Sequence, residues 1–264
     1  MKLTELWERC RGSVCAINYL NHHGEIIGAG TGFIVGRYLV TNNHVFQMPV
    51  ATAGVELHFA QWKNVGLTLP VDPTVFRASL VQGDDEDHWD YAILDIPVIY
   101  CDRIGGLELA SDDSLAVGSE IAVLGHHFLM PQLTMHTGII SSRYTAAGVR
   151  KLQLDASVNP ANSGGPLLDV ETGRVIGIVT RKEHGLSKKF DVLIQSFDQL
   201  IGIFTAAANG PRGLLGNIDP IQSLLHVQQQ MRQVALELHR SANVGIGYAY
   251  EISRVRDVLN GLQS

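Results

Sequence analysis

The sequence has little cysteine: Cys10, Cys15 and Cys101 are the three in 264 residues. Three cysteines cannot form a fully paired disulfide framework, and their spacing lacks the CxxC pattern of a zinc site or a redox pair. We therefore expect reduced, mostly buried thiols.

The sequence also lacks a long unbroken apolar run. The longest apolar window, 192–208, is interrupted by Gln195, Asp198 and Gln199, which makes it too polar to span a bilayer. Residues 1–11 alternate charged and apolar side chains, without the apolar core and small-residue cleavage site of a signal peptide. These absences predict a cytoplasmic protein with no membrane partner.

Neither sign of charge dominates, since the chain has 20 Lys and Arg and 26 Asp and Glu, which gives a net charge of −6. The basic residues are scattered, and such a weak field does not attract phosphates, so nucleic acid is not an expected partner. The 45% hydrophobic content is typical of a globular chain, long enough for one large or two small domains.

Short strand-like segments fill residues 13–180, separated by glycine-rich or polar turns and enriched in β-branched and aromatic residues. No strand–helix alternation accompanies them, which argues against a parallel α/β sheet. The pattern predicts an all-β-dominated fold, an antiparallel barrel or sandwich.

The pattern becomes helical after residue 180. Residues 196–208 are compatible with a helix that ends at Asn209-Gly210-Pro211, and Asp219-Pro220 is typical of a helix start. Apolar or amide residues then recur at helical spacing, namely Ile221, Leu224, Leu225, Gln228, Met231, Ala235 and Leu238. We expect a helical insertion over 181–243 whose apolar stripe packs on the rest of the chain, then a strand at 245–250 and a helix from about Ser253.

Three separated segments carry residues for nucleophilic catalysis. Ser163 precedes Gly-Gly-Pro, a backbone that turns tightly and exposes a hydroxyl but cannot continue as a helix. A serine needs a base, and the base needs an orienting group. His44, in TNNHV, follows a predicted strand, and Asp90 precedes the apolar strand YAIL. The chain order is therefore His, Asp, Ser.

Several ordered blocks resemble trypsin-like serine proteases of the bacterial HtrA/Deg type: TGFIVG, TNNHV, DYAIL, VLGHHF, HTGIISS, NPANSGGPLL and RVIGIVT. The resemblance covers roughly 28–180 and resumes at 244–253. It implies two antiparallel six-stranded β-barrels with the site between them, a serine endopeptidase acting on proteins or peptides, and no cofactor or metal.

The same resemblance implies one protease unit over 1–264 and leaves no segment for a PDZ domain. Its first barrel would span about 12–105, and its second about 106–180 with 244–252. The helical insertion at 181–243 would border the specificity pocket, and residues 253–264 would form the C-terminal helix.

The resemblance also assigns roles at the site. Ser163 would attack the scissile carbonyl, His44 would transfer the proton, and Asp90 would orient the histidine. The backbone N–H groups of Ala161 and Ser163 would form the oxyanion hole. Ala161 stands where the family usually has glycine, so we expect a hole that is malformed at rest and a protease regulated by loop ordering or by an activating protein partner.

Asn162 stands where secreted trypsin relatives carry an aspartate, which pairs with the new amino terminus after zymogen cleavage. A neutral amide cannot form that charged pair, so we do not expect activation by N-terminal cleavage. Ser157 stands where trypsin carries the carboxylate at the base of its specificity pocket. Without that carboxylate, the substrate residue before the cleaved bond (P1) is expected to be small or medium and apolar instead of basic. The substrate-binding residues implied in this way are Ser157, Thr180, Arg181, Lys182 and Gly245.

Other readings of these residues remain open. Ala161 and the insertion also suit a protease-fold module that binds extended peptides with little turnover. An α/β-hydrolase esterase fits poorly, because Pro166 stops the helix that must follow its serine and the chain order differs. The acidic run 84–87 fails the calcium-loop template, and the His22-His23 and His126-His127 pairs lack further metal ligands, so we place these residues in loops.

Overall fold

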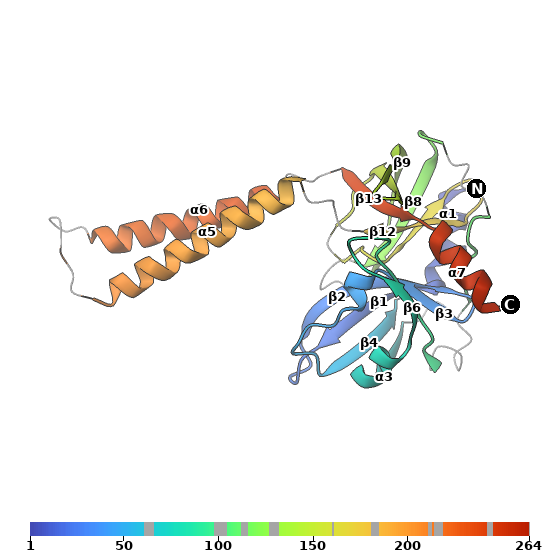
Figure 1. Cartoon of the computed structure of the whole chain (residues 1–264), viewed down its shortest axis with the longest axis horizontal. Helices are drawn as coiled ribbons and strands as arrows, with labels where there is room; N and C mark the ends of the chain where they lie inside the picture. The colour runs from blue at the N-terminus through green and yellow to red at the C-terminus, as the bar shows by residue number, and fades with distance from the viewer. Residues whose placement is uncertain are drawn as a thin grey trace. The chain divides into compact units, whose positions relative to one another are not determined.

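The computed structural model describes residues 1–60, 66–97, 105–111, 116–126, 132–159, 161–180, 185–210, 213, 219–241 and 245–263. The chain forms two compact units (Figure 1). The first, here called the β unit, comprises Met1–Arg181 and Gly245–Ser264, and the second, the helical unit, comprises Lys182–Val244.

Seven antiparallel strands form a sheet in the N-terminal half of the β unit, in the order β5-β4-β1-β2-β3-β7-β6. The strands are β1 (Val14–Leu20), β2 (Ile26–Val35), β3 (Tyr38–Thr41), β4 (Gly54–Phe59), β5 (Leu67–Val71), β6 (Leu80–Asp84) and β7 (Tyr91–Leu94). Two short helices interrupt them, α2 (Asn43–Phe46) and α3 (Pro73–Ala78). Helix α3 starts where the Asp72 carboxylate accepts the N–H groups of Thr74 and Val75, with Pro73 in the first helical position.

The C-terminal half closes into a six-stranded barrel in the order β10-β13-β12-β11-β8-β9. Its strands are β8 (Glu120–His126), β9 (Leu133–Ala146), β10 (Val149–Asp155), β11 (Pro166–Asp169), β12 (Val175–Thr180) and β13 (Ile246–Glu251). Strands β12 and β13 are neighbours, with Thr180 opposite Tyr248, although the helical unit separates them in sequence. The insertion therefore leaves and re-enters the barrel between two paired strands.

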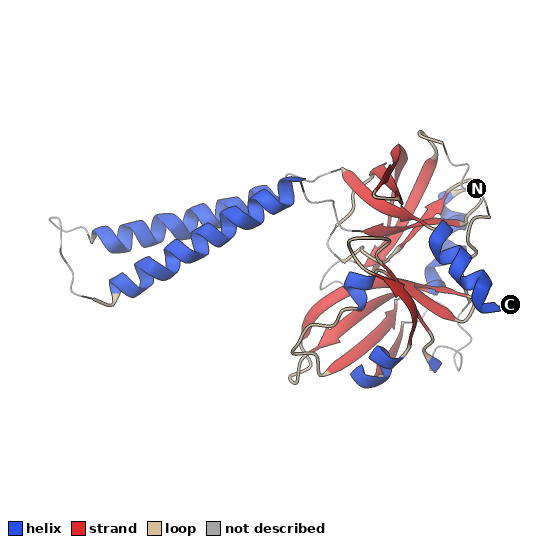
Figure 2. Ribbon diagram, viewed as in Figure 1, coloured by secondary structure: helices blue, strands red, loops and turns tan. Residues whose placement is uncertain are grey.

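The expected all-β-dominated class is confirmed, with a closed barrel and a C-terminal helix, α7 (Ser253–Gln263) (Figure 2). The N-terminal half has seven strands where six were expected, and in the described part of the chain its end strands β5 and β6 do not pair. Helix α3 connects these two end strands. Helix α1 (Leu3–Cys10) and the 3₁₀ turn Arg11–Ser13 precede β1 and were not predicted.

Three apolar clusters stabilise the β unit. One fills the N-terminal sheet around Phe59 and Phe76, and one fills the barrel around Leu154 and Leu167. The third lies between the halves and includes Phe33 and Leu124 together with residues of α1 and α7. Each large side chain buried in this way contributes about 1.5–3 kcal/mol, so the third cluster holds the two halves in one fixed arrangement.

The free cysteines Cys10 and Cys15 are buried, as expected, and Cys101 lies outside the described residues. Burial raises the pKa of the Cys10 thiol to about 11, so this side chain stays a neutral thiol at physiological pH.

The helical unit consists of α5 (Gly185–Ala208) and α6 (Pro220–Ser241), which lie side by side (Figure 1). Helix α6 begins at the predicted N-cap, since the Asp219 carboxylate accepts the N–H groups of Ile221 and Gln222. The two helices are also joined by an ion pair between Arg232 and Asp198, 2.6 Å apart.

The less exposed positions of both helices alternate at spacings of three and four residues, the pattern of a two-helix seam. They include Phe190, Ile194, Phe197, Ile201, Phe204 and Ala208 on α5, and Ile221, Leu225, Gln228, Arg232 and Ala235 on α6. The stripe expected from sequence thus divides: part of it packs in this seam, whereas Leu224, Met231 and Leu238 are exposed. In the described part of the chain, no helix is long and apolar enough to cross a membrane.

Candidate functional site

Ser163 lies in a tight turn that leads into β11. The N–H of Gly165 donates to the carbonyl of Asn162 at 3.0 Å, and the N–H of Gly164 donates to Val179 at 2.8 Å. Gly164 has φ +86°, and a Cβ there would lie 2.1 Å from the Thr31 carbonyl oxygen. Only glycine fits this position, which explains the residue that follows the serine.

Thr31 on β2 fastens this turn to the N-terminal half of the β unit. Its N–H donates to the carbonyl of Ser163 at 2.9 Å, and its hydroxyl donates to the carbonyl of Ala161 at 2.6 Å. The same Oγ1 accepts the N–H of His126, and the Thr31 carbonyl accepts the hydroxyl of Thr41. Thr31 is wholly buried, so each of these groups depends on its protein partner.

The structure brings His44 and Asp90 together. His44 lies on α2, directly after β3, and its Nδ1 is 2.8 Å from Asp90 Oδ2. Its backbone N–H also donates to Asp90 Oδ1 at 3.0 Å. The carboxylate thus accepts Nδ1–H, and this assignment leaves Nε2 as the unprotonated nitrogen.

The Asp90 carboxylate is wholly buried, so its charge needs partners. Thr180 donates its hydroxyl to Asp90 Oδ2 at 3.2 Å, and Asn42 donates its amide to the Asp90 carbonyl at 2.8 Å. The Asp90 N–H donates to the carbonyl of Asp85. Asp85 of the acidic run is therefore part of the turn that positions Asp90.

The charge of Asp90 also acts on the barrel side of the site. Burial lowers the pKa of Lys151, and the negative charge of Asp90 opposes that shift. Burial raises the pKa of Tyr250, and the charges of Asp90 and Glu86 add to this effect. The Tyr250 hydroxyl donates to the carbonyl of Glu86, which ties strand β13 to the acidic turn.

Ala161 has φ +76°, a conformation that costs a non-glycine residue about 1–2 kcal/mol. It keeps the left-handed backbone that a glycine would adopt at the position two before the serine. The N–H groups of Ala161 and Ser163 donate to no other described residue. The left-handed backbone at Ala161 is therefore kept at a cost in strain.

The neighbouring Asn162 side chain is buried, and neither its nitrogen nor its oxygen has a hydrogen-bond partner among the described residues. Such a group in contact with the Ser163 turn weakens it, because a buried amide without partners carries its full desolvation penalty.

The residues expected to bind substrate differ in exposure. Ser157 is exposed between β10 and the Ser163 turn, and Gly245 has φ +90° just before β13 with open space around it. The side chain of Thr180 is buried against Asp90 instead of standing at an open strand edge. Arg181 and Lys182 lie outside the described residues.

The two histidine pairs also differ in exposure. His22 and His23 are exposed in a turn, whereas His126 is buried at the end of β8, so placing it in a loop was wrong. His127 is outside the described residues. Within those residues, no group of three or more His, Cys, Asp or Glu could hold a metal ion.

Sequence reasoning missed Thr31, Asn42 and the positioning contact of Thr180. Thr31 opens the block TGFIVG and Asn42 lies within TNNHV, so their places in these blocks were the available signals. What their side chains bind is visible only in three dimensions, since the partners of these side chains lie 48 to 130 residues away along the chain.

Comparison with known proteins gives the family. The model of the trypsin-like peptidase domain matches residues 30–178. This chain belongs to the trypsin-like peptidase family. It is 33% identical over 217 residues to a probable periplasmic serine endoprotease, DegP-like, of Chlamydia pneumoniae, covering 78% of this chain and 40% of that protein. The resemblance to HtrA/Deg proteases is thereby confirmed.

Two further comparisons agree. The periplasmic pH-dependent serine endoprotease DegQ of Escherichia coli is 32% identical over 161 residues, 58% of this chain and 31% of that protein. A crystal structure of the serine endoprotease from Yersinia pestis shares the fold, with a TM-score of 0.59 at 18% identity over 99% of this chain and 66% of that one. The chain spans less than half the length of the two curated relatives.

The expected cytoplasmic location is wrong. Both curated relatives are named periplasmic enzymes, which points to a periplasmic location. The expectation rested on the composition of residues 1–11 and on the three cysteines, and neither feature determines a compartment.

We predict that Thr31→Val destabilises the β unit by about 2–4 kcal/mol, because the variant leaves the buried Ala161 carbonyl and the His126 N–H without their partner. Thr31→Ser keeps the hydroxyl and should lose only about 1 kcal/mol for the missing methyl. Urea unfolding measures both, and equal losses would show that the hydroxyl contributes nothing.

We predict that Ala161→Gly keeps or raises the free energy of unfolding by up to about 1 kcal/mol, since relief of the left-handed strain exceeds the added entropy of the unfolded chain. Ala147, which has φ +50° in the exposed β9–β10 turn, is the matched control, and Ala147→Gly should act alike. A loss of more than about 1 kcal/mol at position 161 alone contradicts the assignment of strain there.

Proposed function

We propose that this chain is a serine endopeptidase that hydrolyses peptide bonds of protein or peptide substrates with Ser163, His44 and Asp90. The observation that carries the proposal is the Asp90 carboxylate, buried and bonded through its two oxygens to the ring and the backbone of His44. Family membership supports it, because the relatives are named serine endoproteases.

The reaction follows from this geometry. His44 Nε2 removes the proton of the Ser163 hydroxyl as its oxygen attacks the scissile carbonyl, and Asp90 stabilises the imidazolium that forms. The imidazolium then protonates the leaving amine, which leaves an acyl-enzyme that water hydrolyses. The N–H groups of Ala161 and Ser163 stabilise the oxyanion, a contribution of about 3–4 kcal/mol per donor.

Among the described residues, the hydrogen bonds of the His44 side chain run to Asp90 and none runs to Ser163. In proteases without substrate this catalytic hydrogen bond is often long and shortens only in the complex. We therefore assign its formation to substrate binding.

Regulation belongs to the proposal as well. The strained Ala161 and the Asn162 amide, which has no hydrogen-bond partner among the described residues, both lie beside Ser163, so both features disfavour the assembled turn. A protein partner or ordered loop that binds the assembled turn would raise activity. An isolated chain whose turnover no ligand or partner increases would contradict this part.

Replacing the nucleophile tests the reaction. Ser163→Ala should reduce casein cleavage at least about 10³-fold, since the residual rate comes from the oxyanion hole and binding alone. Ser196→Ala, an exposed serine on α5, is the matched control and should cleave at the rate of the parent. Equal cleavage by the Ser163 variant would contradict the proposal, and a folded parent protein that binds a peptide without cleaving it would favour a binding module instead.

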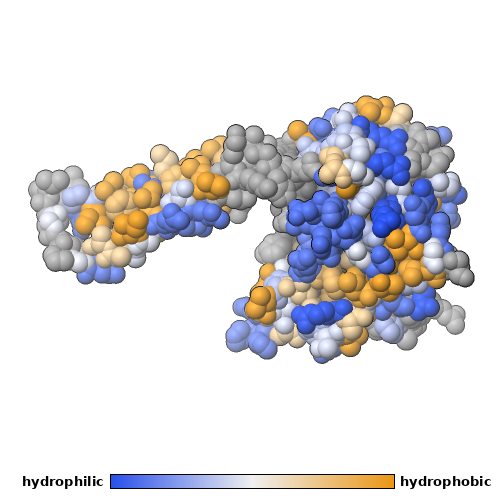
Figure 3. Space-filling model, viewed as in Figure 1, coloured by the Kyte–Doolittle hydropathy of each residue, from blue (hydrophilic) through white to orange (hydrophobic). Residues whose placement is uncertain are grey.

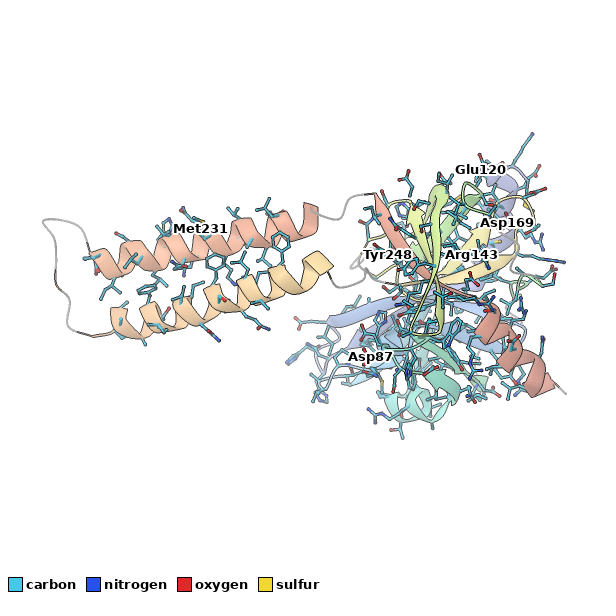
Figure 4. The ribbon with its side chains drawn as sticks, turned by 45° about the horizontal axis from the view of Figure 1, so that its top comes forward. Asp87, Glu120, Arg143, Asp169, Met231 and Tyr248 are labelled. Carbon is cyan, nitrogen blue, oxygen red and sulfur yellow. The ribbon has the colours of Figure 1, made fainter. Side chains whose placement is uncertain are left out.

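Replacing the buried carboxylate tests its role separately. Asp90→Asn should lower kcat about 10³–10⁴-fold with little change in KM, because the amide favours the wrong histidine tautomer. Asp87→Asn removes the same charge from an exposed position in the same acidic run (Figure 4) and should leave kcat unchanged. Similar kcat values for the two variants would exclude Asp90 from the mechanism.

A further inference from the structure

The helical unit exposes a second apolar stripe besides its seam. On α6 it consists of five residues spaced three and four apart, and on α5 of four residues. These are Leu224, Val227, Met231, Val234 and Leu238, with Val192, Leu193, Leu200 and Ile203. Their exposed fractions range from 38% at Leu200 to 63% at Val192. A solvated helix face rarely repeats large apolar residues in this way.

The stripes of the two helices lie on one side of the pair. At 100° per residue, each stripe is centred roughly 100° around its helix from the seam, in the same rotational sense along the chain. Because the helices run in opposite directions, equal rotations bring both stripes to the same side. Apolar atoms gather along the helical unit over both helices in Figure 3, and Met231 lies outside the seam in Figure 4.

This surface, here called the second face, carries no charge among the described side chains. Among the side chains that the structure describes on the two helices, the charged ones are Asp198, Arg232 and Glu237. Asp198 and Arg232 pair with each other, and by helix phase Glu237 falls away from the second face. Among these described side chains, no like-charge repulsion opposes contact between two identical faces.

The size of the second face suits a dimer. Its nine side chains, about half exposed, leave on the order of 800 Å² open, which is what each partner contributes to a standard protein interface. Ordinary monomers expose patches of about 300–600 Å² at most. Helices of 24 and 22 residues, about 36 and 33 Å long, match the dimensions of helices in four-helix bundles.

We propose that a second copy of this chain covers the second face, so that two helical units pack into a four-helix bundle. The contact is isologous: each copy presents the same nine residues to the other across a two-fold axis. Within each copy the seam joins α5 to α6, and between the copies the second face joins one pair of helices to the other. Each helix then packs on two neighbours, as in antiparallel bundles. This inference does not depend on the proteolytic activity.

The test is the mass of the particles that the full chain forms, measured by sedimentation equilibrium. At a concentration of about 50 μM we expect a contact of this area to hold two chains together. The parent protein should contain twice as many chains per particle as the variant Ile203→Glu/Val234→Glu, which places buried charges at the contact. Gln195→Glu/Gln229→Glu adds the same two charges to exposed positions off the second face and should keep the parent mass.

A milder variant, Met231→Gln/Leu238→Gln, keeps helix-forming side chains and should weaken the association at least about 10-fold. Circular dichroism confirms that each variant retains the parent helix content. A parent protein that sediments as a single chain, whether its second face packs on its own β unit or stays exposed, overturns the proposal. So does an assembly whose mass neither second-face variant reduces.

Discussion

The β unit is organised around one buried charge, the Asp90 carboxylate. A carboxylate without water costs several kcal/mol unless its oxygens are bonded, and here the partners come from distant parts of the chain. His44 lies on α2 and Thr180 at the end of β12, so residues of the sheet and of the barrel meet at one side chain. Satisfying the charge therefore requires both halves to be in register.

Thr31 adds the complementary constraint on Ser163, the proposed nucleophile. It connects β2 to the turn of Ser163 through its N–H and its hydroxyl, while the apolar cluster between the halves fixes their distance. His44 and Ser163, the proposed base and nucleophile, are thus held by separate contacts that share one rigid interface. This arrangement lets the Ser163 turn carry strain at Ala161 without disturbing the pair of His44 and Asp90.

Much of this site was predictable because its chemistry depends on local motifs. The block around Ser163 required glycine where a Cβ would collide with Thr31, and TNNHV and DYAIL placed the histidine and the aspartate at strand ends. The supporting contacts were not predictable, since Thr31 and Thr180 bind groups far away in sequence. Helix α6 and the 196–208 part of α5 were also predicted, whereas α5 begins at Gly185. Sequence periodicity could not separate the seam from the second face: both repeat every seven residues, and only exposure distinguishes Leu225 from Met231.

In the proposed mechanism, the buried Asp90 and His44 activate Ser163. Reaction of the folded full chain with a fluorophosphonate, followed by peptide mapping, tests it most directly. We expect a single covalent adduct on the Ser163 oxygen, formed in the parent protein and lost when His44 is replaced by alanine. A folded protein that forms no adduct, or an adduct on another serine, would contradict it.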